Sequence, residues 1–121
     1  MKILLIDDDA FLRDMYATKF GEKGHTVDVA PSVEIALTKL HEKKYDVVLT
    51  DVIMPGMTGI QLIEKIFAET LASKPMCIML SNQTEESEKQ AALAAGAVGY
   101  IVKAELIPSE VVEEVLRLVS K

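Results

Sequence analysis

Residues 46–59 read DVVLTDVIMPGMTG, an apolar run that ends at an aspartate and is followed by a loop rich in proline and glycine. The run at 47–50 predicts a buried strand over about residues 46–50, and Asp51 comes directly after it. Similar short apolar runs recur along the chain and predict strands at about residues 2–6, 76–80 and 98–103, and alternating valines predict another at 26–30. The chain therefore contains five predicted strands.

Helix-like patterns separate these strands. Apolar residues at helical spacing predict two helices in the first part of the chain, over about 10–23 and 32–43, and a third that includes 60–67. A fourth helix is predicted from a cap at Thr84 to about Ala95, and a fifth starts near Pro108. Asp9 and Ser32 are placed to cap the first two helices, and Gly24 and Gly96 to end helices. Strands that alternate with helices predict an α/β protein in which helices cover both faces of a parallel sheet. We expect a single domain over residues 1–121 with a flavodoxin-like, doubly wound sheet ordered 2-1-3-4-5 and five helices.

Composition limits the classes of function. The chain has 121 residues, 50% of them hydrophobic and 26% charged, with a formal net charge of −6, which suits one globular domain and argues against direct binding of nucleic acid. Its apolar runs are far shorter than the roughly 20 residues that span a bilayer, and the N-terminus lacks a signal-peptide pattern. We expect a cytoplasmic protein without membrane insertion. The single cysteine, Cys77, lies in a strand-like run and is predicted to be a buried, inert thiol.

Reactive side chains follow four of the five strands. They are Asp7, Asp8 and Asp9 after the first, Asp51 after the third, Ser81 after the fourth and Lys103 after the fifth. In an open parallel sheet the carboxyl ends of the strands share one edge, so these groups should converge. Two carboxylates about 4 Å apart repel by about 4 kcal/mol at an effective dielectric constant near 20. An oxygen-only cluster of this kind favours Mg²⁺, with Mn²⁺ as a plausible substitute.

The same groups suit phosphoryl transfer. A carboxylate can act as a nucleophile and form an aspartyl-phosphate, and Asp51 is the carboxylate of the central strand. An ammonium such as Lys103 and a hydroxyl such as Ser81 can stabilise the charge on the transferred group. Because no separate base is evident that would speed hydrolysis, the pattern favours a switch over an enzyme with turnover.

These residues carry a family resemblance that extends over essentially the whole chain. The chain resembles a response-regulator receiver domain of two-component signalling, as in chemotaxis regulators. The resemblance rests on LIDDD at 5–9 followed by Arg13, on DVIMPGMTG at 51–59, which is similar to the phospho-acceptor motif D-x-x-M-P-x-M-x-G, and on Ser81, Tyr100 and Lys103 at matching intervals.

The resemblance implies a role for each site residue. Asp51 would be the phospho-acceptor, Asp8 and Asp51 direct Mg²⁺ ligands together with the backbone carbonyl of Ile53, and Asp7 a ligand acting through water. Ser81 and Lys103 would contact the phosphoryl group, and Tyr100 would move inward when Ser81 is drawn toward it. The phosphoryl donor would be a histidine kinase or histidine phosphotransfer protein. The output would be a changed surface on helix 4, strand 5 and helix 5, about residues 84–120, that regulates a downstream protein target or output domain.

Three positions depart from the family pattern. Ala104 follows Lys103 where proline, typically with a cis bond, is usual; since a cis bond before a residue other than proline costs about 2.5–4 kcal/mol, we expect a trans bond or a strained local exception. Asn82 stands where a small residue is usual and affects access to the phosphoryl group. Thr58 replaces a frequent aspartate, with an effect that we expect to be local.

Other interpretations concern the same residues. Asp9 is better explained as a helix cap than as a metal ligand, and Tyr100 has core packing as an alternative to switching. Asp7-Asp8-Asp9 approximates the D-x-D motif of haloacid-dehalogenase-like phosphatases, but Phe11 stands where that motif has Thr or Val, and no cap insertion is present. Catalytic release of phosphate would distinguish such an enzyme. The remaining alternative is a receiver-fold interaction module that works without phosphorylation.

Overall fold

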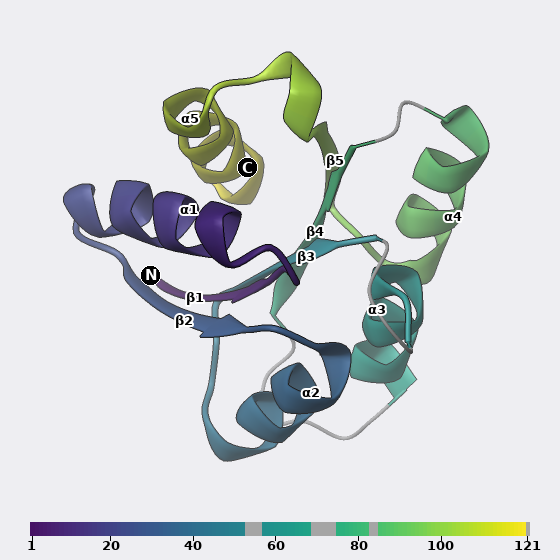
Figure 1. Ribbon diagram of the computed structural model, residues 1–121. Coiled ribbons are helices and arrows are strands. Elements are labelled where there is room, and N and C mark those ends of the chain that lie inside the picture. The colour runs from purple at the N-terminus through teal and green to yellow at the C-terminus, as the bar shows by residue number, and fades with distance from the viewer. Residues whose placement is uncertain (53–56, 69–74, 83–84, 121) are drawn as a thin grey trace.

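The computed structural model describes residues 1–52, 57–68, 75–82 and 85–120. Its five strands form one parallel sheet in the order β2-β1-β3-β4-β5, which confirms the predicted topology (Figure 1). The strands are β1 (Lys2–Ile6), β2 (Thr26–Ala30), β3 (Val47–Asp51), β4 (Met76–Ser81) and β5 (Gly99–Val102).

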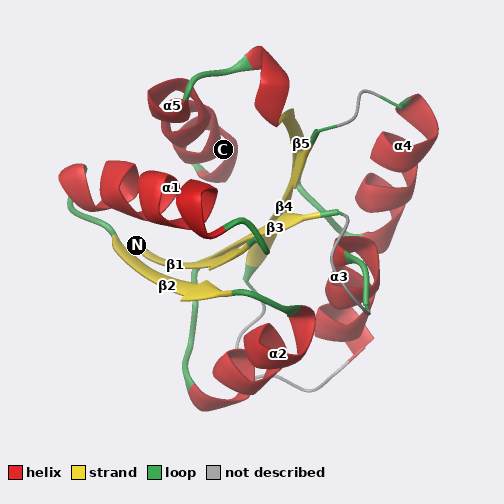
Figure 2. Cartoon of the chain, in the orientation of Figure 1, coloured by secondary structure: helices red, strands yellow, loops and turns green. Residues whose placement is uncertain are grey.

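Five α-helices cover the two faces of the sheet. They are α1 (Ala10–Glu22), α2 (Val33–Glu42), α3 (Gly59–Ala68), α4 (Glu86–Ala95) and α5 (Pro108–Val119), with a short 3₁₀ helix, η1 (Lys103–Glu105), after β5. Helices α1 and α5 lie on one face, and α2, α3 and α4 lie on the other (Figures 1 and 2). This three-layer α/β arrangement is the predicted doubly wound fold.

The strands separate the core into two layers because successive side chains point to opposite faces. In β1, Ile3 and Leu5 pack with α1 and α5, whereas Leu4 and Ile6 pack with the helices of the other face. All four are at most 1% exposed, and burying each aliphatic side chain is worth about 1.5–3 kcal/mol. The same alternation runs through β3 and β4. It decides which face each residue at the carboxyl edge of the sheet approaches.

The predicted caps are confirmed where the structure describes them. The Asp9 side chain accepts hydrogen bonds from the backbone N–H groups of Phe11 and Leu12, and the Ser32 hydroxyl accepts one from Ile35. Gly96 ends α4 with φ +122°, a conformation that favours glycine. The predicted cap at Thr84 lies outside the described residues.

Three strands end one residue away from the prediction, and β4 is one of them, because it extends to Ser81. The ladder of β3 extends to Asp51, which is in register with Leu80 of β4, so this aspartate is the last residue of its strand. Strand β5 runs only from Gly99 to Val102, because the carbonyl of Lys103 accepts a hydrogen bond from the N–H of Leu106 and closes the 3₁₀ turn. The peptide bond between Lys103 and Ala104 is trans, as expected.

The two helices that flank β5 are anchored differently. Helix α5 buries Val111, Val112 and Val115 against the sheet, whereas the buried residue of α4 is Ala92. Alanine removes much less apolar surface from water than valine does, so α4 has the weaker hydrophobic attachment.

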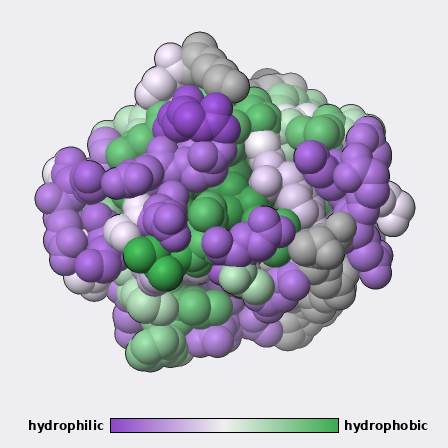
Figure 3. Space-filling view, turned by 90° about the horizontal axis from the view of Figure 1, so that it is seen from above, coloured by the Kyte–Doolittle hydropathy of each residue, from purple (hydrophilic) through white to green (hydrophobic). Residues whose placement is uncertain are grey.

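The surface is of mixed character on one face, and the lone cysteine is buried as predicted. On the face seen from above, hydrophilic side chains surround smaller hydrophobic areas (Figure 3). No helix among the described segments combines the length and the apolar character needed to cross a membrane. Cys77 is 0% exposed, and burial raises the pKa of its thiol to about 12, so the thiol is uncharged at neutral pH as predicted.

Candidate functional site

Three charged side chains meet at the carboxyl edge of the sheet, on the face covered by α1 and α5. Asp7 continues the alternation of Ile3 and Leu5, and Asp51 and Lys103 likewise follow residues of that face. The Lys103 Nζ lies 2.7 Å from Asp7 Oδ2 and 2.8 Å from Asp51 Oδ2. We call Asp7, Asp51 and Lys103 the ionic cluster. Its side chains are at most 10% exposed.

Asp7 is held on several sides. Its Oδ1 accepts a hydrogen bond of 2.9 Å from the N–H of Asp9, while its Oδ2 accepts the bond from Lys103. Its backbone carbonyl accepts a hydrogen bond of 2.8 Å from the Arg13 guanidinium on α1. Both carboxylate oxygens of Asp7 thus accept hydrogen bonds within the protein, and these bonds fix the position of this side chain in the ionic cluster.

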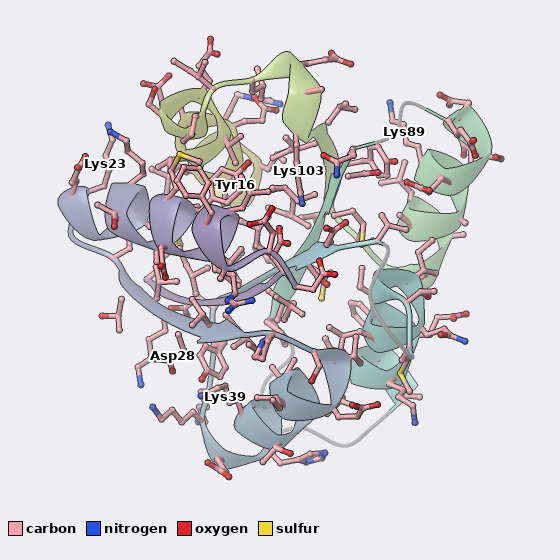
Figure 4. The ribbon with its side chains drawn as sticks, viewed as in Figure 1. Tyr16, Lys23, Asp28, Lys39, Lys89 and Lys103 are labelled. Carbon is pink, nitrogen blue, oxygen red and sulfur yellow. The ribbon has the colours of Figure 1, made fainter. Side chains whose placement is uncertain are left out.

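Charge and burial act against each other in this cluster. Burial lowers the pKa of Lys103, but the hydrogen bonds and charges of Asp51 and Asp7 outweigh it, so the pKa lies above its ordinary value. The neighbouring phenol of Tyr16, on α1, lies beside Lys103 (Figure 4). Burial raises the pKa of Tyr16; Lys103 acts to lower it, and the carboxylates of Asp7 and Asp51 to raise it. The lysine therefore stays charged and the phenol neutral at pH 7.

The site has the donor set expected for a hard cation. Oxygen atoms of Asp7, Asp8 and Asp51 lie within 4.8 Å of one another, and Asp8 is exposed. Lys103 contributes one positive charge against these three carboxylates, so the group carries an excess of two negative charges when all are ionised. Oxygen ligands and excess negative charge fit Mg²⁺. The predicted fourth ligand, the carbonyl of Ile53, lies outside the described residues.

The start of α3 lies directly against Asp51. A Cβ atom on Gly59 would stand 2.0 Å from the Asp51 carbonyl oxygen, so only glycine fits there. The hydroxyl of Thr58 accepts a hydrogen bond from the N–H of Gln61, whose side chain accepts one from the N–H of Thr58. This reciprocal cap fixes the first turn of α3 beside the aspartate. Thr58, which departs from the family pattern, thus caps the start of α3.

Ser81 and Tyr100 lie on the opposite face of the sheet edge, toward α4. The Ser81 hydroxyl donates a hydrogen bond of 2.8 Å to Oε1 of Glu88 on α4, and the Tyr100 hydroxyl donates to the same oxygen. We call Ser81, Glu88 and Tyr100 the hydroxyl cluster. Burial and the Glu88 carboxylate raise the pKa of Tyr100 to about 12, against a lowering by Ser81. Both hydroxyls are therefore neutral donors to one carboxylate.

A groove lies on the outer side of Tyr100. It has a volume of about 420 Å³ between α4, β5 and α5. Tyr100 shares its lining with Lys89, with Leu106 and with glutamates of α4, η1 and α5. The hydroxyl cluster thus connects the edge of the sheet to the surface formed by these elements.

The structure brings together the sequence-predicted residues in two groups and adds others. Asp7, Asp51 and Lys103 make direct contact, Asp8 stands beside them, and Ser81 contacts Tyr100 and Glu88. Asn82 is exposed.

Sequence reasoning did not identify Glu88, the proximity of Tyr16 to the ionic cluster, or the close approach of Gly59 to Asp51. Alternation along the strands would have assigned Ser81 and Lys103 to opposite faces, but nothing in the sequence of α4 indicates which glutamate reaches the serine.

The chain is similar to known proteins over most of its length. The sequence profile described as "Response regulator receiver domain" matches residues 3–115. The chain is 38% identical over 103 residues to the two-component response regulator PhoP of Pseudomonas aeruginosa, which covers 85% of this chain and 45% of that protein. It is 33% identical over 106 residues to the gliding motility regulatory protein of Myxococcus xanthus, covering 88% of this chain and 14% of that protein. The chain thus spans less than half the length of these two relatives.

Solved structures show the same architecture. The chemotaxis response regulator CheY4 of Vibrio cholerae superimposes with a TM-score of 0.88 at 29% identity, over 97% of each chain. A two-component response regulator from Clostridium difficile superimposes with a TM-score of 0.89 at 25% identity, over 100% of this chain and 97% of the other. These matches confirm the fold and the resemblance inferred from the sequence motifs.

Proposed function

The chain belongs to the family of response regulator receiver domains, and we propose that it is a Mg²⁺-dependent switch that accepts a phosphoryl group on Asp51. The observation that carries the proposal is the ionic cluster, in which Lys103 bonds the Asp51 carboxylate at a buried strand end. Membership of this family supports phosphorylation-based signalling, and the residues of the ionic cluster would supply the chemistry.

In the proposed transfer an Asp51 carboxylate oxygen attacks the phosphorus of a phosphohistidine. The new P–O bond forms as the P–N bond to the imidazole breaks, and the imidazole nitrogen keeps the electron pair. Lys103 stays protonated and stabilises the negative charge on the phosphoryl oxygens, for which its bonds to Asp7 and Asp51 pre-position it. Ser81 is to donate a hydrogen bond to a further phosphoryl oxygen.

We assign the metal to Asp8 and Asp51 as direct ligands, with Asp7 acting through water. Both oxygens of Asp7 already accept hydrogen bonds, whereas the Asp8 side chain is exposed at the edge of the cluster. A bound Mg²⁺ would supply positive charge opposite the phosphoryl oxygens and relieve repulsion among the carboxylates. The Ile53 carbonyl is the further ligand that the family pattern implies.

The proposed partners are a histidine kinase or histidine phosphotransfer protein upstream and a protein target or output domain downstream. The output surface is assigned to α4, β5 and α5, where Tyr100 lines the groove described above. Phosphorylation would change the relative stability of two conformations of this surface, and a partner that prefers one of them reads the signal. The chain itself would have no catalytic turnover beyond its own phosphorylation and slow dephosphorylation.

Intact mass after incubation with phosphoramidate or acetyl phosphate tests the proposal. We expect one phosphoryl adduct of about 80 Da on the wild type in Mg²⁺, no adduct in EDTA and none on Asp51→Asn. The matched control is Asp46→Asn, since Asp46 directly precedes β3 at the end opposite Asp51 and the substitution should leave the adduct unchanged. A wild-type chain that gains no adduct while circular dichroism shows it folded would contradict the proposal and favour an interaction module that works without phosphorylation.

A further inference from the structure

Glu88 is the shared acceptor of the hydroxyl cluster. One of its oxygens, Oε1, receives the Ser81 hydroxyl at 2.8 Å and also the hydroxyl of Tyr100. Ser81 is 2% exposed and Glu88 is half-buried, so both bonds are partly shielded from water. Hydrogen bonds to an ionised acceptor are about twice as strong as those between neutral groups. The two hydroxyls are therefore held toward α4.

The proton of Ser81 cannot serve two acceptors at once. A serine hydroxyl has a single O–H donor, and here that donor is directed to Glu88. If Ser81 is to donate to a phosphoryl oxygen on Asp51, the bond to Glu88 must first be broken. Occupation of the phosphoryl site and the Ser81–Glu88 bond are thus mutually exclusive.

Glu88 also connects this competition to the output surface. It belongs to α4, whose buried residue is Ala92, so the apolar attachment of this helix to the sheet is weaker than that of α5. Its second donor, Tyr100, lines the groove between α4, β5 and α5. Loss of the serine bond would leave Tyr100 as the remaining hydroxyl of the cluster on Glu88 and would change how α4 is held at the edge of the groove.

We infer that Glu88 is a positioning residue that holds Ser81 and Tyr100 in the unphosphorylated arrangement and competes with the phosphoryl group for the Ser81 proton. The inference rests on the proposed function, because it assumes that a phosphoryl group on Asp51 accepts a hydrogen bond from Ser81. It identifies Glu88 as the side chain of α4 that links phosphorylation of Asp51 to a change at the output surface.

Beryllofluoride, a mimic of the phosphoryl group, provides the test. We would measure its half-saturating concentration at fixed Mg²⁺ by ¹⁹F NMR for the wild type, Glu88→Gln and Glu88→Ala. Glu88→Gln should lower that concentration by about three- to tenfold, because the difference in net worth between a hydrogen bond to a charged acceptor and one to a neutral acceptor sets the scale, and Glu88→Ala should lower it at least as much. The matched control is Glu86→Gln on the same helix, which removes an exposed carboxylate bonded to Gln90 and should change the value less than about twofold.

The decisive arm repeats Glu88→Gln in a Ser81→Ala background. If Glu88 acts through the Ser81 proton, the substitution has no effect there. An equal gain in affinity with and without Ser81 would overturn the inference, because it would reflect the charge or the packing of Glu88 alone. Unchanged affinity in Glu88→Gln with Ser81 present would also overturn it.

Failure of the proposed function has a different signature. It would appear as a folded wild-type chain that binds no beryllofluoride in a manner dependent on Asp51 and Mg²⁺, and the inference would fall with it. Saturable binding by the wild type, absent in Asp51→Asn, keeps the proposed function and makes the Glu88 variants a test of the inference alone.

Discussion

The two clusters at the carboxyl edge of the sheet differ in how they are held. The ionic cluster joins residues at the ends of β1, β3 and β5 and lies on the face where α1 and α5 pack. The hydroxyl cluster joins β4 and β5 to α4, a helix with one small buried residue. A buried ionic cluster on strand ends provides the fixed geometry that phosphoryl transfer needs. A weakly attached helix, by contrast, can shift when the site is phosphorylated. Alternation along the strands thus places the reacting groups on one face and the hydroxyl groups that contact α4 on the other face of a single edge.

Removing the lysine should break the ionic cluster with the largest effect. Lys103→Met leaves Asp7 and Asp51 buried without their counter-charge, so we expect the free energy of unfolding to fall by about 3 kcal/mol in EDTA. Urea denaturation measures this loss. Lys89→Met, at an exposed lysine of α4, should change stability by less than about 0.5 kcal/mol. A loss below about 1 kcal/mol for Lys103→Met would show that the cluster is not a fixed ionic arrangement.

Adding one methyl group beside Asp51 should have the next largest effect. Gly59→Ala places Cβ 2.0 Å from the Asp51 carbonyl oxygen, so α3 must shift, and we expect a destabilisation of about 2 kcal/mol and slower phosphorylation. Gly21→Ala is the matched control within α1, because nothing lies within 4 Å of its Cβ, and it should stabilise by about 0.5–1 kcal/mol. Thermal unfolding compares the two. Similar behaviour of both variants would contradict the close approach of α3 to Asp51.

The unequal attachment of α4 and α5 can be measured by truncating one apolar side chain in each helix. Val112→Ala in α5 removes a side chain that is 1% exposed and should cost about 2 kcal/mol. Leu93→Ala in α4 removes one that is 39% exposed and should cost less than about 1 kcal/mol. Chemical denaturation of both variants gives the two values. Equal costs would remove the distinction between the helices.

A second tyrosine–carboxylate pair, away from the site, should give the smallest effect. The Tyr45 hydroxyl donates to Asp28 Oδ2 at 2.6 Å, with Lys43 at 3.3 Å. The Tyr45 hydrogen bond lowers the pKa of Asp28, against the opposing effect of burial, and Lys43 lowers it further.

Because the folded-state pKa of Asp28 is depressed, the stabilisation is present above the ordinary value of 3.8 and is lost as the pH falls through the folded-state value. We expect Asp28→Asn to cost about 1 kcal/mol at pH 7 and progressively less in acid, as urea denaturation at several pH values would show. A cost that does not depend on pH would contradict the assignment. Beryllofluoride affinity should be unchanged, unlike that of Glu88→Gln.

The strands could be predicted because they depend on local pattern, and the convergence of the site residues could be predicted from the order of those strands. Apolar runs indicated the strands, and the order 2-1-3-4-5 brought the ends that carry Asp7, Asp51, Ser81 and Lys103 to one edge. Strand ends were correct only to within one residue, because the last hydrogen bonds of β3 and the 3₁₀ turn at Lys103 depend on neighbouring segments.

Glu88 could not be predicted from the same patterns. The sequence of α4, ESEKQAALAA, has polar residues in its first half and alanines around one leucine in its second, so its apolar pattern does not define which side chains face the sheet. The rotation of that helix, and with it the acceptor for Ser81, follows from packing against α3 and β5. The approach of Gly59 to Asp51 is likewise a tertiary contact that a glycine in a loop motif does not reveal.

Hydrogen exchange followed by mass spectrometry tests most directly whether occupation of the phosphoryl site changes the structure of α4. Amide exchange in α4 (Glu86–Ala95) and α5 (Pro108–Val119) would be compared with and without beryllofluoride and Mg²⁺, using Asp51→Asn as the control. We expect exchange in α4 to change when beryllofluoride binds, while the buried turns of α5 keep their protection. Unchanged exchange in α4, or an equal change in both helices, would contradict the assignment of the chemistry to the ionic cluster and of the structural change to α4.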